Sequence, residues 1–311
     1  MISPPLHTRI APTPSGYLHR GNAFSFVLTW LFARSDGGTL HLRIDDLDAD
    51  RTRPEYIADV LETLAWLGLD YDTGPRSVQD FQANWSQRRR LDAYTQALEQ
   101  LREQGDLFAC TCSRRTEGAF SESGIYTGLC RNTQHSFSQN DVAWRFRSEN
   151  ASNEAEFTDI ERGKIRINTS ATMGDVVLRR KDGIPAYHIA SLIDDELDGI
   201  TFIVRGNDLL PSTAVQCALA ERLYLCGFPI HSFPKVHFLH HPLLLDAEQK
   251  KLSKSHGAAP LKVFREQGGT PHEIYRSVAE YLKIPEPVQT LQELLTAFEM
   301  FFSKLRRKNI C

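Results

Sequence analysis

The first 44 residues alternate between strand-like and helix-like segments in an order that few folds accommodate. Residues 7–11 have the composition of a short strand, and residues 39–44 alternate apolar with polar side chains as a second strand would. Between them, Pro12–Gly16 is a cluster of structure breakers, and residues 18–34 then repeat apolar side chains at helical spacing. This order predicts a parallel sheet, in which ligands bind at the carboxyl ends of the strands.

The alternation returns later in the chain, after one irregular stretch. Helical spacing of apolar residues predicts further helices at residues 53–67, 86–103 and 212–225. Short apolar runs predict further strands at residues 143–147, 176–178 and 200–204. From about residue 108 to residue 168, by contrast, Cys, Ser, Asn and Thr crowd around short strand-like pieces.

We therefore predict an α/β protein with a Rossmann-type parallel-sheet domain that is interrupted by an insert. The sheet domain would comprise residues 1–107 and 175–260, and the insert would be an α+β subdomain of residues 108–174. Residues 261–311 would form a short helical segment at the carboxyl end.

Composition limits the kinds of protein this chain can be. Its 311 residues are 41% hydrophobic and 24% charged, which is ordinary for a soluble protein. No stretch approaches the roughly 20 apolar residues of a membrane span, and the first residues lack a secretion signal, so we expect a cytoplasmic protein without membrane contact. The net charge of −3 does not by itself indicate a nucleic-acid partner. Two basic stretches, Arg88–Arg90 and Lys304–Lys308, fit either solvated helix faces or RNA contact.

Three of the six cysteines, Cys110, Cys112 and Cys130, lie within one short stretch. This is not the even distribution of a disulfide framework, and in a reducing compartment such a cluster more often binds a metal. The alternative is a set of three reduced, partly buried thiols. Cys217 and Cys226 fall within and just after a predicted helix, and we expect them in the core.

Two segments are suited to binding phosphate. In the first, residues 14–22, Gly16 frees the turn and Gly21 lets a ligand lie against the backbone. The start of the following helix offers unpaired N–H groups that attract anions, and His19 would donate a hydrogen bond to charge that builds on a phosphate. Taken alone, the segment also fits a capped helix with an incidental histidine.

The second segment, Lys250–Gly257, places closely spaced lysines on a stretch rich in Ser and Gly. Cations fixed where negative charge develops stabilise a transition state by roughly a few kcal/mol each. As an isolated charge run this stretch would be a solvated loop. The combination of the two segments, more than 200 residues apart, is what indicates a function.

LHRGN in the first segment and KLSKS in the second resemble the two signature motifs of class I aminoacyl-tRNA synthetases, in the same order and at a similar separation. The resemblance implies that an amino acid is activated with ATP and Mg²⁺, and the sequence offers no dedicated protein cage for the magnesium. It assigns catalysis to His19, Lys251 and Lys254. It assigns ATP binding to the matching motif positions, which are His19, Gly21, Asn22, Lys251, Leu252, Ser253 and Lys254.

Three further runs narrow the resemblance to the glutamyl-tRNA synthetases. They are residues 9–19, 42–48 and 182–206, and the similarity covers most of residues 7–265. By this resemblance, Arg9 and Arg205 would hold the carboxylates of glutamate. Thr13 and Tyr187 would form hydrogen bonds through their hydroxyl groups, and the carboxylate of Asp45 would pair with the ammonium group.

Asp45 departs from the glutamyl pattern, which has Glu at this position, and matches the glutaminyl one. The preceding loop, residues 12–16, has the glutamyl form Pro-Thr-Pro-Ser-Gly. For Asp45 and Arg205 the alternative is a structural ion pair. In the implied first step, the α-carboxylate of glutamate attacks the α-phosphorus of ATP, pyrophosphate leaves, and glutamyl-adenylate forms without a protein nucleophile.

Only 56 residues follow Ser255, whereas a full glutamyl-tRNA synthetase continues with helical domains that read the anticodon. We therefore expect no anticodon-binding domain. The shorter form resembles the glutamyl-Q tRNA(Asp) synthetases, which attach glutamate to queuosine in the anticodon of tRNA(Asp), and it implies that tRNA as the partner of a monomeric enzyme. Two alternatives are a short glutamyl-tRNA synthetase that acylates a tRNA acceptor end and a non-catalytic RNA-binding paralogue.

The cysteine stretch agrees with this resemblance. Cys110, Cys112, Tyr126 and Cys130 match a Cys-x-Cys…Tyr-x-x-x-Cys arrangement that occurs in zinc-binding glutamyl-Q synthetases. Three thiolates and one further ligand would complete a tetrahedral structural Zn²⁺ site. Tyrosine is an uncommon fourth ligand, and His135 is a candidate on chemistry alone.

Overall fold

The computed structural model describes residues 6–152, 154–243 and 260–308 of the chain. The backbone forms two compact units, each assembled from segments that are distant in sequence. Unit 1 consists of Met1–Gln87, Phe202–Asn207 and His241–Cys311, and unit 2 consists of Arg88–Thr201 and Asp208–His240. This division follows other boundaries than the domains expected from the sequence, which remain a prediction.

Unit 1 begins with the predicted strand, helix and strand: β1 (His7–Ile10), α1 (Arg20–Ser35) and β2 (Thr39–Leu42). The two strands run parallel, with Thr8 opposite Leu40, so the prediction of a parallel pair is confirmed. Ten of the sixteen residues of α1 are buried. The helix is therefore covered on nearly all sides, as a helix in the middle of a core must be.

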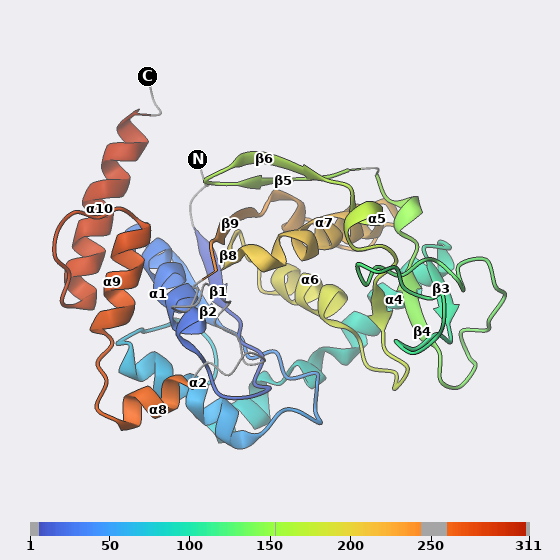
Figure 1. The fold of residues 1–311 in the computed structure, drawn as a ribbon, viewed down its shortest axis with the longest axis horizontal. Coiled ribbons are helices and arrows are strands. Elements are labelled where there is room, and N and C mark those ends of the chain that lie inside the picture. Colours follow the sequence, from blue (N-terminus) through green and yellow to red (C-terminus); the bar gives the residue numbers. More distant parts are fainter. Residues whose placement is uncertain (1–5, 153, 244–259, 309–311) are drawn as a thin grey trace. The chain divides into compact units, whose positions relative to one another are not determined.

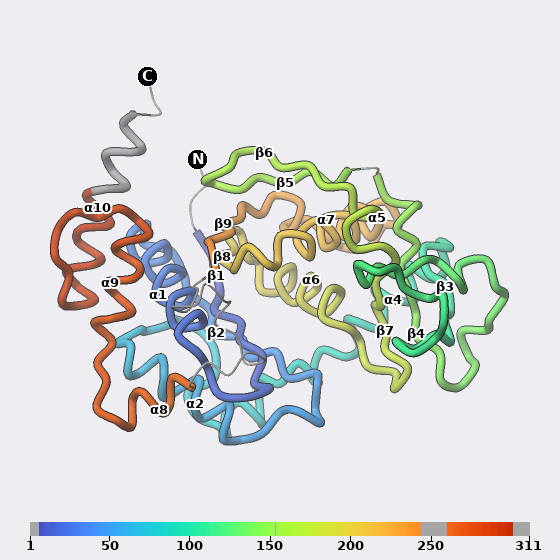
Figure 2. Tube along the Cα trace, viewed as in Figure 1, coloured from blue at the N-terminus to red at the C-terminus, as the bar shows by residue number. Residues whose placement is uncertain are grey.

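Much of this cover comes from segments far along the chain (Figures 1 and 2). Besides β1 and β2, the elements that contact α1 are β8 (Phe202–Gly206), α9 (His272–Tyr281) and α10 (Leu291–Lys308). The ring of Phe32 in α1 lies 5.0 Å from that of Phe202 and 5.1 Å from that of Phe298. Residues from the carboxyl end thus complete the core around the first helix.

Two glycines allow the tight passage from α1 into β2. Gly37 has a φ of 61°, a conformation that side chains other than glycine rarely adopt. A side chain on Gly38 would overlap the carbonyl oxygen of Leu6, whose neighbouring strand runs close by. Asp36, Gly37 and Gly38 therefore end the helix. Unit 1 also contains the helices α2 (Pro54–Trp66), α3 (Val78–Asp80) and α8 (Leu261–Glu266).

Unit 2 holds two groups of strands. The first is an antiparallel sheet in the order β3 (Leu107–Cys110), β4 (Ala143–Phe146) and β7 (Val177–Arg179). In the second, β5 (Ala155–Asp159) pairs antiparallel with β6 (Gly163–Ile167) and parallel with β9 (His237–His241). The stretch of irregular composition around residues 108–168 thus contains β4, which was predicted at residues 143–147, together with β5, β6 and most of β3.

Three longer helices pack together in unit 2, and a short one, α5 (Thr169–Thr172), accompanies them. They are α4 (Leu91–Glu103), α6 (Tyr187–Leu197) and α7 (Leu210–Leu225). The predicted helix over residues 86–103 is divided, because a 3-10 turn over Gln87–Arg90 precedes α4. Among the residues that the structure describes, none of the helices has the length and apolar character that a membrane crossing requires.

A buried ionic cluster joins α4 to α6. The carboxylate of Asp194, which is fully buried, accepts a hydrogen bond from the hydroxyl of Tyr94 at 2.7 Å and one from Arg90 at 3.0 Å. Arg90 also pairs with Asp198 at 2.6 Å. Hydrogen bonds to a buried charge are stronger than hydrogen bonds between neutral groups. These contacts therefore fix the first turn of α4 against α6.

A second buried carboxylate, Asp159 at the end of β5, holds the neighbouring strand and turn. One oxygen accepts the backbone N–H of His240 at 2.9 Å and lies 2.8 Å from Nδ1 of the same ring. The other accepts the backbone N–H groups of Glu161 and Arg162 at 3.0 and 3.1 Å. Burial alone would raise the pKa of Asp159, but the hydrogen bonds from His240 outweigh it and the pKa is lowered.

Candidate active site and cysteine cluster

The carboxyl ends of β1 and β2 bring three of the predicted glutamate-binding residues onto adjoining segments. Arg9 lies one residue before the end of β1 and is 5% exposed. Hydrogen bonding between the two segments continues beyond the strands, because the N–H of Asp45 donates to the carbonyl oxygen of Pro12 at 2.9 Å. Thr13 follows Pro12 directly, so the structure places Thr13 and Asp45 at the same edge.

Asp45 forms an ion pair within its own segment. Nε of Arg43 donates to Oδ1 of Asp45 at 2.8 Å, and the two side chains are only 3% and 10% exposed. Asp45 thus takes part in a structural ion pair, in which Arg43 is a partner. An ionised carboxylate has about four lone-pair positions, so this pair is compatible with a further bond to an ammonium group.

The fourth candidate of unit 1, Arg205, lies in β8 and is also 5% exposed. β8 contacts β1, the strand that carries Arg9. Two guanidinium groups are thus buried on contacting strands. Planar donors of this kind suit a small molecule that carries two carboxylates.

The phosphate-binding segment predicted before α1 has the geometry of a helix start. His19 precedes the helix in an extended conformation, with φ −121° and ψ 170°. Its N–H donates to the side-chain oxygen of Asn22 at 3.0 Å, and the N–H of Asn22 donates to the carbonyl oxygen of His19 at 2.9 Å. No acidic residue occupies the first turn of α1, so the partial positive charge at this helix start is not offset there. Gly21 lies within the same turn.

Two parts of the predicted site are not among the described residues of unit 1. Tyr187, the first residue of α6, belongs to unit 2, and its side chain is partly exposed beside the ring of His188. The lysine motif, with Lys251, Leu252, Ser253 and Lys254, lies outside the described residues. The roles assigned to these positions remain predictions.

The cysteine stretch forms a compact buried cluster in unit 2. The sulfur atoms of Cys110, Cys112 and Cys130 all lie within 4.8 Å of one another. Oη of Tyr126 lies 3.4 Å from Sγ of Cys110 and 3.7 Å from Sγ of Cys112, and it accepts the N–H of Cys130 at 2.8 Å. The structure thus brings together all four residues of the predicted ligand set.

These separations fit a single ion at the centre of the cluster. Tetrahedral ligands at the usual zinc–sulfur distance of about 2.3 Å lie roughly 3.8 Å apart, and Cys112 and Cys130 have their sulfurs 3.4 Å apart. His135, the other candidate ligand, is placed differently: its Nε2 lies 3.5 Å from Oγ1 of Thr111, and it is not part of the cysteine group. The described cluster could therefore hold a metal with Tyr126 as its nearest oxygen.

The thiols of the cluster differ in acidity. Burial opposes ionisation of Cys130, but hydrogen bonds from the Thr111 N–H and from Cys112 and Tyr126 outweigh it and lower its pKa to about 6. Burial, with the hydrogen bond to Cys130, raises the pKa of Cys112 to about 11. Burial also raises the pKa of Tyr126. One thiolate is thus stabilised in advance, and a cation would be needed to ionise Cys112 and Tyr126.

Arg145 supports the cluster from β4. Its Nε lies 3.2 Å from Sγ of Cys110, and its guanidinium carbon lies 3.8 Å above the ring of Tyr126. Nη1 donates to the carbonyl oxygen of Asp175 at 2.7 Å, which fixes the orientation of the group. A buried cation beside three thiols offsets the negative charge that a metal-bound form would carry.

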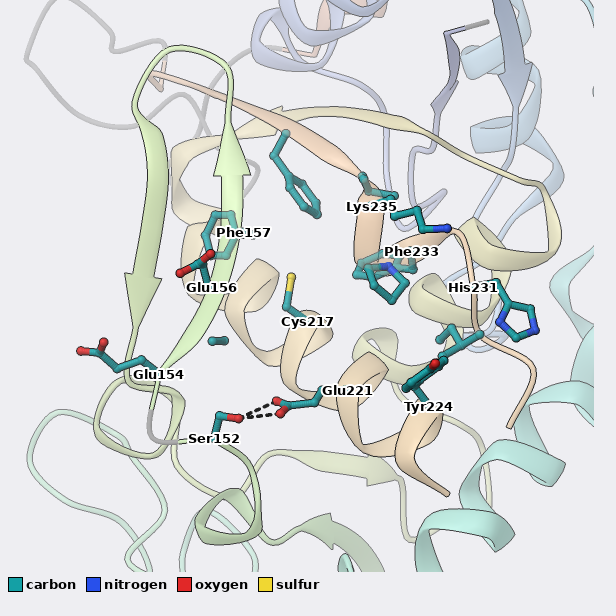
Figure 3. A pocket seen from close by; sticks show the side chains of 15 residues that line it. Ser152, Glu154, Glu156, Phe157, Cys217, Glu221, Tyr224, His231, Phe233 and Lys235 are labelled. Atoms are coloured by element: carbon teal, nitrogen blue, oxygen red, sulfur yellow. Dashed lines mark hydrogen bonds between the residues drawn. The ribbon is translucent and has the colours of Figure 1, made fainter. Parts of the chain in front are cut away.

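Unit 2 also contains a cavity of about 570 Å³ between the β5–β6 hairpin, α7 and the segment before β9 (Figure 3). Phe157 and Phe233 line it, and Cys217, which was expected in the core, is half-buried at its wall. At one end, the hydroxyl of Ser152 donates to Glu221 at 2.6 Å. Of the predicted site residues that the structure describes, none lines this cavity.

With this geometry established, comparison with known proteins identifies the family. A sequence profile described as "tRNA synthetases class I (E and Q), catalytic domain" matches residues 5–305. The chain belongs to this family. As a class I synthetase it is a ligase with the Rossmann-like parallel-sheet fold of that catalytic domain, and class I synthetases use ATP with Mg²⁺.

Similar relatives within this family differ in length. The chain is 36% identical over 307 residues to a glutamyl-Q tRNA(Asp) synthetase from Symbiobacterium thermophilum, covering 94% of this chain and 92% of the relative. It is 33% identical over 310 residues to a glutamate–tRNA ligase from Coprothermobacter proteolyticus, covering 94% of this chain and 62% of the relative. A solved glutamate tRNA ligase from Elizabethkingia meningosepticum, in complex with its amino acid, matches with a TM-score of 0.70 at 26% identity, over 93% of this chain and 64% of that one. The chain thus spans less than two thirds of the length of these two ligases.

Two residues of this synthetase site were not found by the sequence analysis. Arg43 lies two positions before Asp45 on an extended segment, and residues with that spacing share one face, so the ion pair could have been anticipated. Arg145 gives no such signal in the sequence. Its contact with the thiol of Cys110 depends on the pairing of β4 with β3, which the sequence does not reveal.

Proposed function

We propose that this synthetase activates glutamate with ATP and transfers it to queuosine in the anticodon of tRNA(Asp). The observation that carries the proposal is the match to the glutamyl-Q relative along 92% of that protein's length. The four-residue cluster at Cys110, Cys112, Tyr126 and Cys130 supports it. We also propose that the enzyme works as a monomer in the cytoplasm.

Recognition of glutamate would depend on the edge of β1 and β2. We propose that Arg9 and Arg205 bind the two carboxylates, because both guanidinium groups are buried and lie on contacting strands. Asp45, oriented by its bond to Arg43, would bind the ammonium group, and Thr13 would bind through its hydroxyl. Tyr187, the first residue of α6, is proposed to bind glutamate through its hydroxyl group.

The first reaction would take place at the start of α1. A carboxylate oxygen of glutamate attacks the α-phosphorus, the bond to the bridging oxygen of pyrophosphate breaks, and glutamyl-adenylate results. His19 and the N–H groups around Gly21 and Asn22 would stabilise charge on the phosphate. The lysines Lys251 and Lys254, with Leu252 and Ser253, would follow the triphosphate, and Mg²⁺ would accompany ATP.

In the second reaction, a hydroxyl oxygen of the queuosine cyclopentenediol would attack the carbonyl carbon of the adenylate. AMP leaves, the hydroxyl proton is released, and an ester joins glutamate to the modified base. Positioning supplies most of the catalysis in such a transfer, because the acyl group is already activated.

We propose that the cysteine cluster binds a structural Zn²⁺ through Cys110, Cys112 and Cys130, with Tyr126 as the fourth ligand. A bound zinc ion would fasten the loop between β3 and β4 to the sheet and would remove the thiol protons. Arg145 would keep Cys110 and Tyr126 oriented, as partners of metal ligands commonly do.

The test is to supply ATP and labelled glutamate with tRNA(Asp) that contains queuosine or lacks it. We expect label only on the queuosine-containing tRNA, and nuclease mapping should place it in the anticodon. Label at the 3′ end of a glutamate-accepting tRNA would instead indicate a short glutamyl-tRNA synthetase. Absence of ATP–pyrophosphate exchange with any amino acid would indicate the non-catalytic, RNA-binding alternative.

A further inference from the structure

The backbone of Leu18, the residue before His19, is held from both sides. Its N–H donates to Oδ2 of Asp59 at 2.9 Å, and its carbonyl oxygen accepts the N–H of Leu261 at 2.8 Å. Leu18 and Leu261 are almost completely buried. The two bonds come from different helices, α2 and α8, so the peptide groups on either side of Leu18 cannot turn without breaking one of them.

Asp59 is in turn fixed by Arg265 of α8. Nη2 of Arg265 donates to Oδ1 of Asp59 at 2.8 Å, and the two side chains are 10% and 1% exposed. Burial raises the pKa of Asp59, against the lowering effects of the Leu18 N–H and Arg265. A carboxylate in such a place is tolerated because both of its oxygens have donors, and loss of one donor would leave an uncompensated buried charge.

Two further contacts attach the same segment to the carboxyl-terminal helices. Tyr17 directly precedes Leu18, and the ammonium nitrogen of Lys262 lies 4.8 Å from the centre of its ring. The guanidinium of Arg20, one residue after His19, lies 4.6 Å from the Phe264 ring and pairs with a carboxylate of α9 at 2.8 Å. The positions immediately around His19 are therefore tied to α8 and α9.

We propose that Asp59 and Arg265 are positioning residues for His19. This inference rests on the proposed function, in which His19 stabilises charge on the α-phosphate. α8 begins only seven positions after Lys254 in the sequence, so the element that holds the histidine motif is also the first described helix after the lysine motif. The pair acts through the backbone of Leu18 and does not touch the substrates in this assignment.

The consequence is a loss of rate in the folded protein, with little change in glutamate affinity. A displacement of a catalytic group by about 1 Å can reduce the rate about 100-fold, so we expect Asp59→Asn to lower kcat for ATP–pyrophosphate exchange by about 10- to 100-fold. KM for glutamate should change less than about twofold, because the residues proposed to bind glutamate lie on other segments. The Arg265→Lys variant keeps the positive charge but has no planar set of donors. It should retain part of the kcat that Asp59→Asn loses.

Glu62→Gln is the matched control. Glu62 lies on α2 three residues after Asp59 and bonds to the same Arg265 at 3.1 Å, but its side chain is 62% exposed. We expect this variant to keep the wild-type kcat, KM and melting temperature. All rates are referred to the concentration of folded protein from circular dichroism, so that partial unfolding of Asp59→Asn is not counted as a catalytic effect.

A double-mutant cycle with His19→Ala decides whether Asp59 acts through the histidine. We expect Asp59→Asn to change kcat less than about threefold once His19 is absent, because effects that share one pathway are not additive. Equal loss in both backgrounds would overturn the proposal, and so would a wild-type kcat for Asp59→Asn alone.

Hydrogen exchange keeps the inference separable from the proposed function. In Asp59→Asn, amides of residues 17–24 should exchange at least about tenfold faster, with no change in Glu62→Gln. If the wild-type protein fails to exchange pyrophosphate with glutamate, the proposed function is wrong, while faster amide exchange confined to this segment still supports the anchoring role. Unchanged amide exchange in Asp59→Asn would overturn the anchoring role whatever the activity.

Discussion

The buried carboxylate of Asp159 allows a quantitative prediction about the stability of unit 2. Its two oxygens take four close contacts, two with backbone N–H groups of the β5–β6 turn and two with His240 of β9. In Asp159→Asn one oxygen survives, and the other becomes an NH₂ group that faces the N–H of His240. Two hydrogen bonds to a charged group are lost in a fully buried place.

Each bond to a buried charged group contributes about 1.5–3 kcal/mol, and disruption of a buried charged pair costs about 3–5 kcal/mol. We therefore expect Asp159→Asn to lower the free energy of unfolding by about 3–5 kcal/mol. With a urea dependence of about 2 kcal/mol per molar, the unfolding midpoint should fall by roughly 1.5–2.5 M, as followed by far-ultraviolet circular dichroism.

Asp141→Asn is a suitable control for the same substitution at the surface. Asp141 pairs with Lys181 at 3.2 Å, but its side chain is 79% exposed, and surface pairs contribute less than about 1 kcal/mol. If the midpoint of Asp159→Asn falls no further than that of Asp141→Asn, the structural reasoning about Asp159 is refuted.

The effect of Asp159 also depends on pH. Its pKa in the folded protein lies below the ordinary value of 3.8, so its stabilisation is complete above that value and is lost as the pH falls through the lower, folded pKa. The difference in stability between wild type and Asp159→Asn should therefore be constant from about pH 5 to pH 7 and should narrow below about pH 4. A difference that widens on acidification would contradict the assigned direction of the pKa.

Three further outcomes follow from the described contacts. Cys130→Ser should remove tightly bound zinc, measured as release to a colorimetric chelator, and wild-type zinc content in this variant would argue against the proposed ligand set. Asp45→Glu, which lengthens the carboxylate held by Arg43, should change KM for glutamate at least about threefold with a smaller change in KM for ATP. Tyr94→Phe should lower the free energy of unfolding by about 1.5–3 kcal/mol, since the buried Asp194 loses a donor, and an unchanged urea midpoint would exclude that role.

The parts of the fold that the sequence predicted well are those with local signals. The first strand, helix and strand were found because breaker residues separate them and because apolar spacing differs between helix and strand. The limits moved by one or two residues, as at α1, where the helix begins at Arg20 after the His19 cap. By contrast, β5 and β6 were missed, since their polar exposed faces and short lengths look like irregular chain.

The candidate site divides in the same way. Recognition of His19, Arg9 and the cysteine stretch needed only local motifs, and the structure places these residues on a helix start, a strand end and a compact cluster. The supporting contacts could not be predicted, because Arg265 and Asp59 are more than 200 positions apart. No pattern in either segment indicates that the two residues pair. Sequence motifs identify groups that carry chemistry, whereas the groups that hold them depend on tertiary packing.

The covering of α1 by the end of the chain has a consequence for how the protein is made. Phe32 rests against Phe298, which a ribosome adds 266 residues later. At about 5–20 residues per second, the first helix waits roughly 13–53 s before its own apolar surface can be enclosed. All of unit 2 is synthesised during that interval. The newborn chain therefore passes through a period in which part of the apolar surface of its first helix lacks its native cover, and α10 supplies that cover.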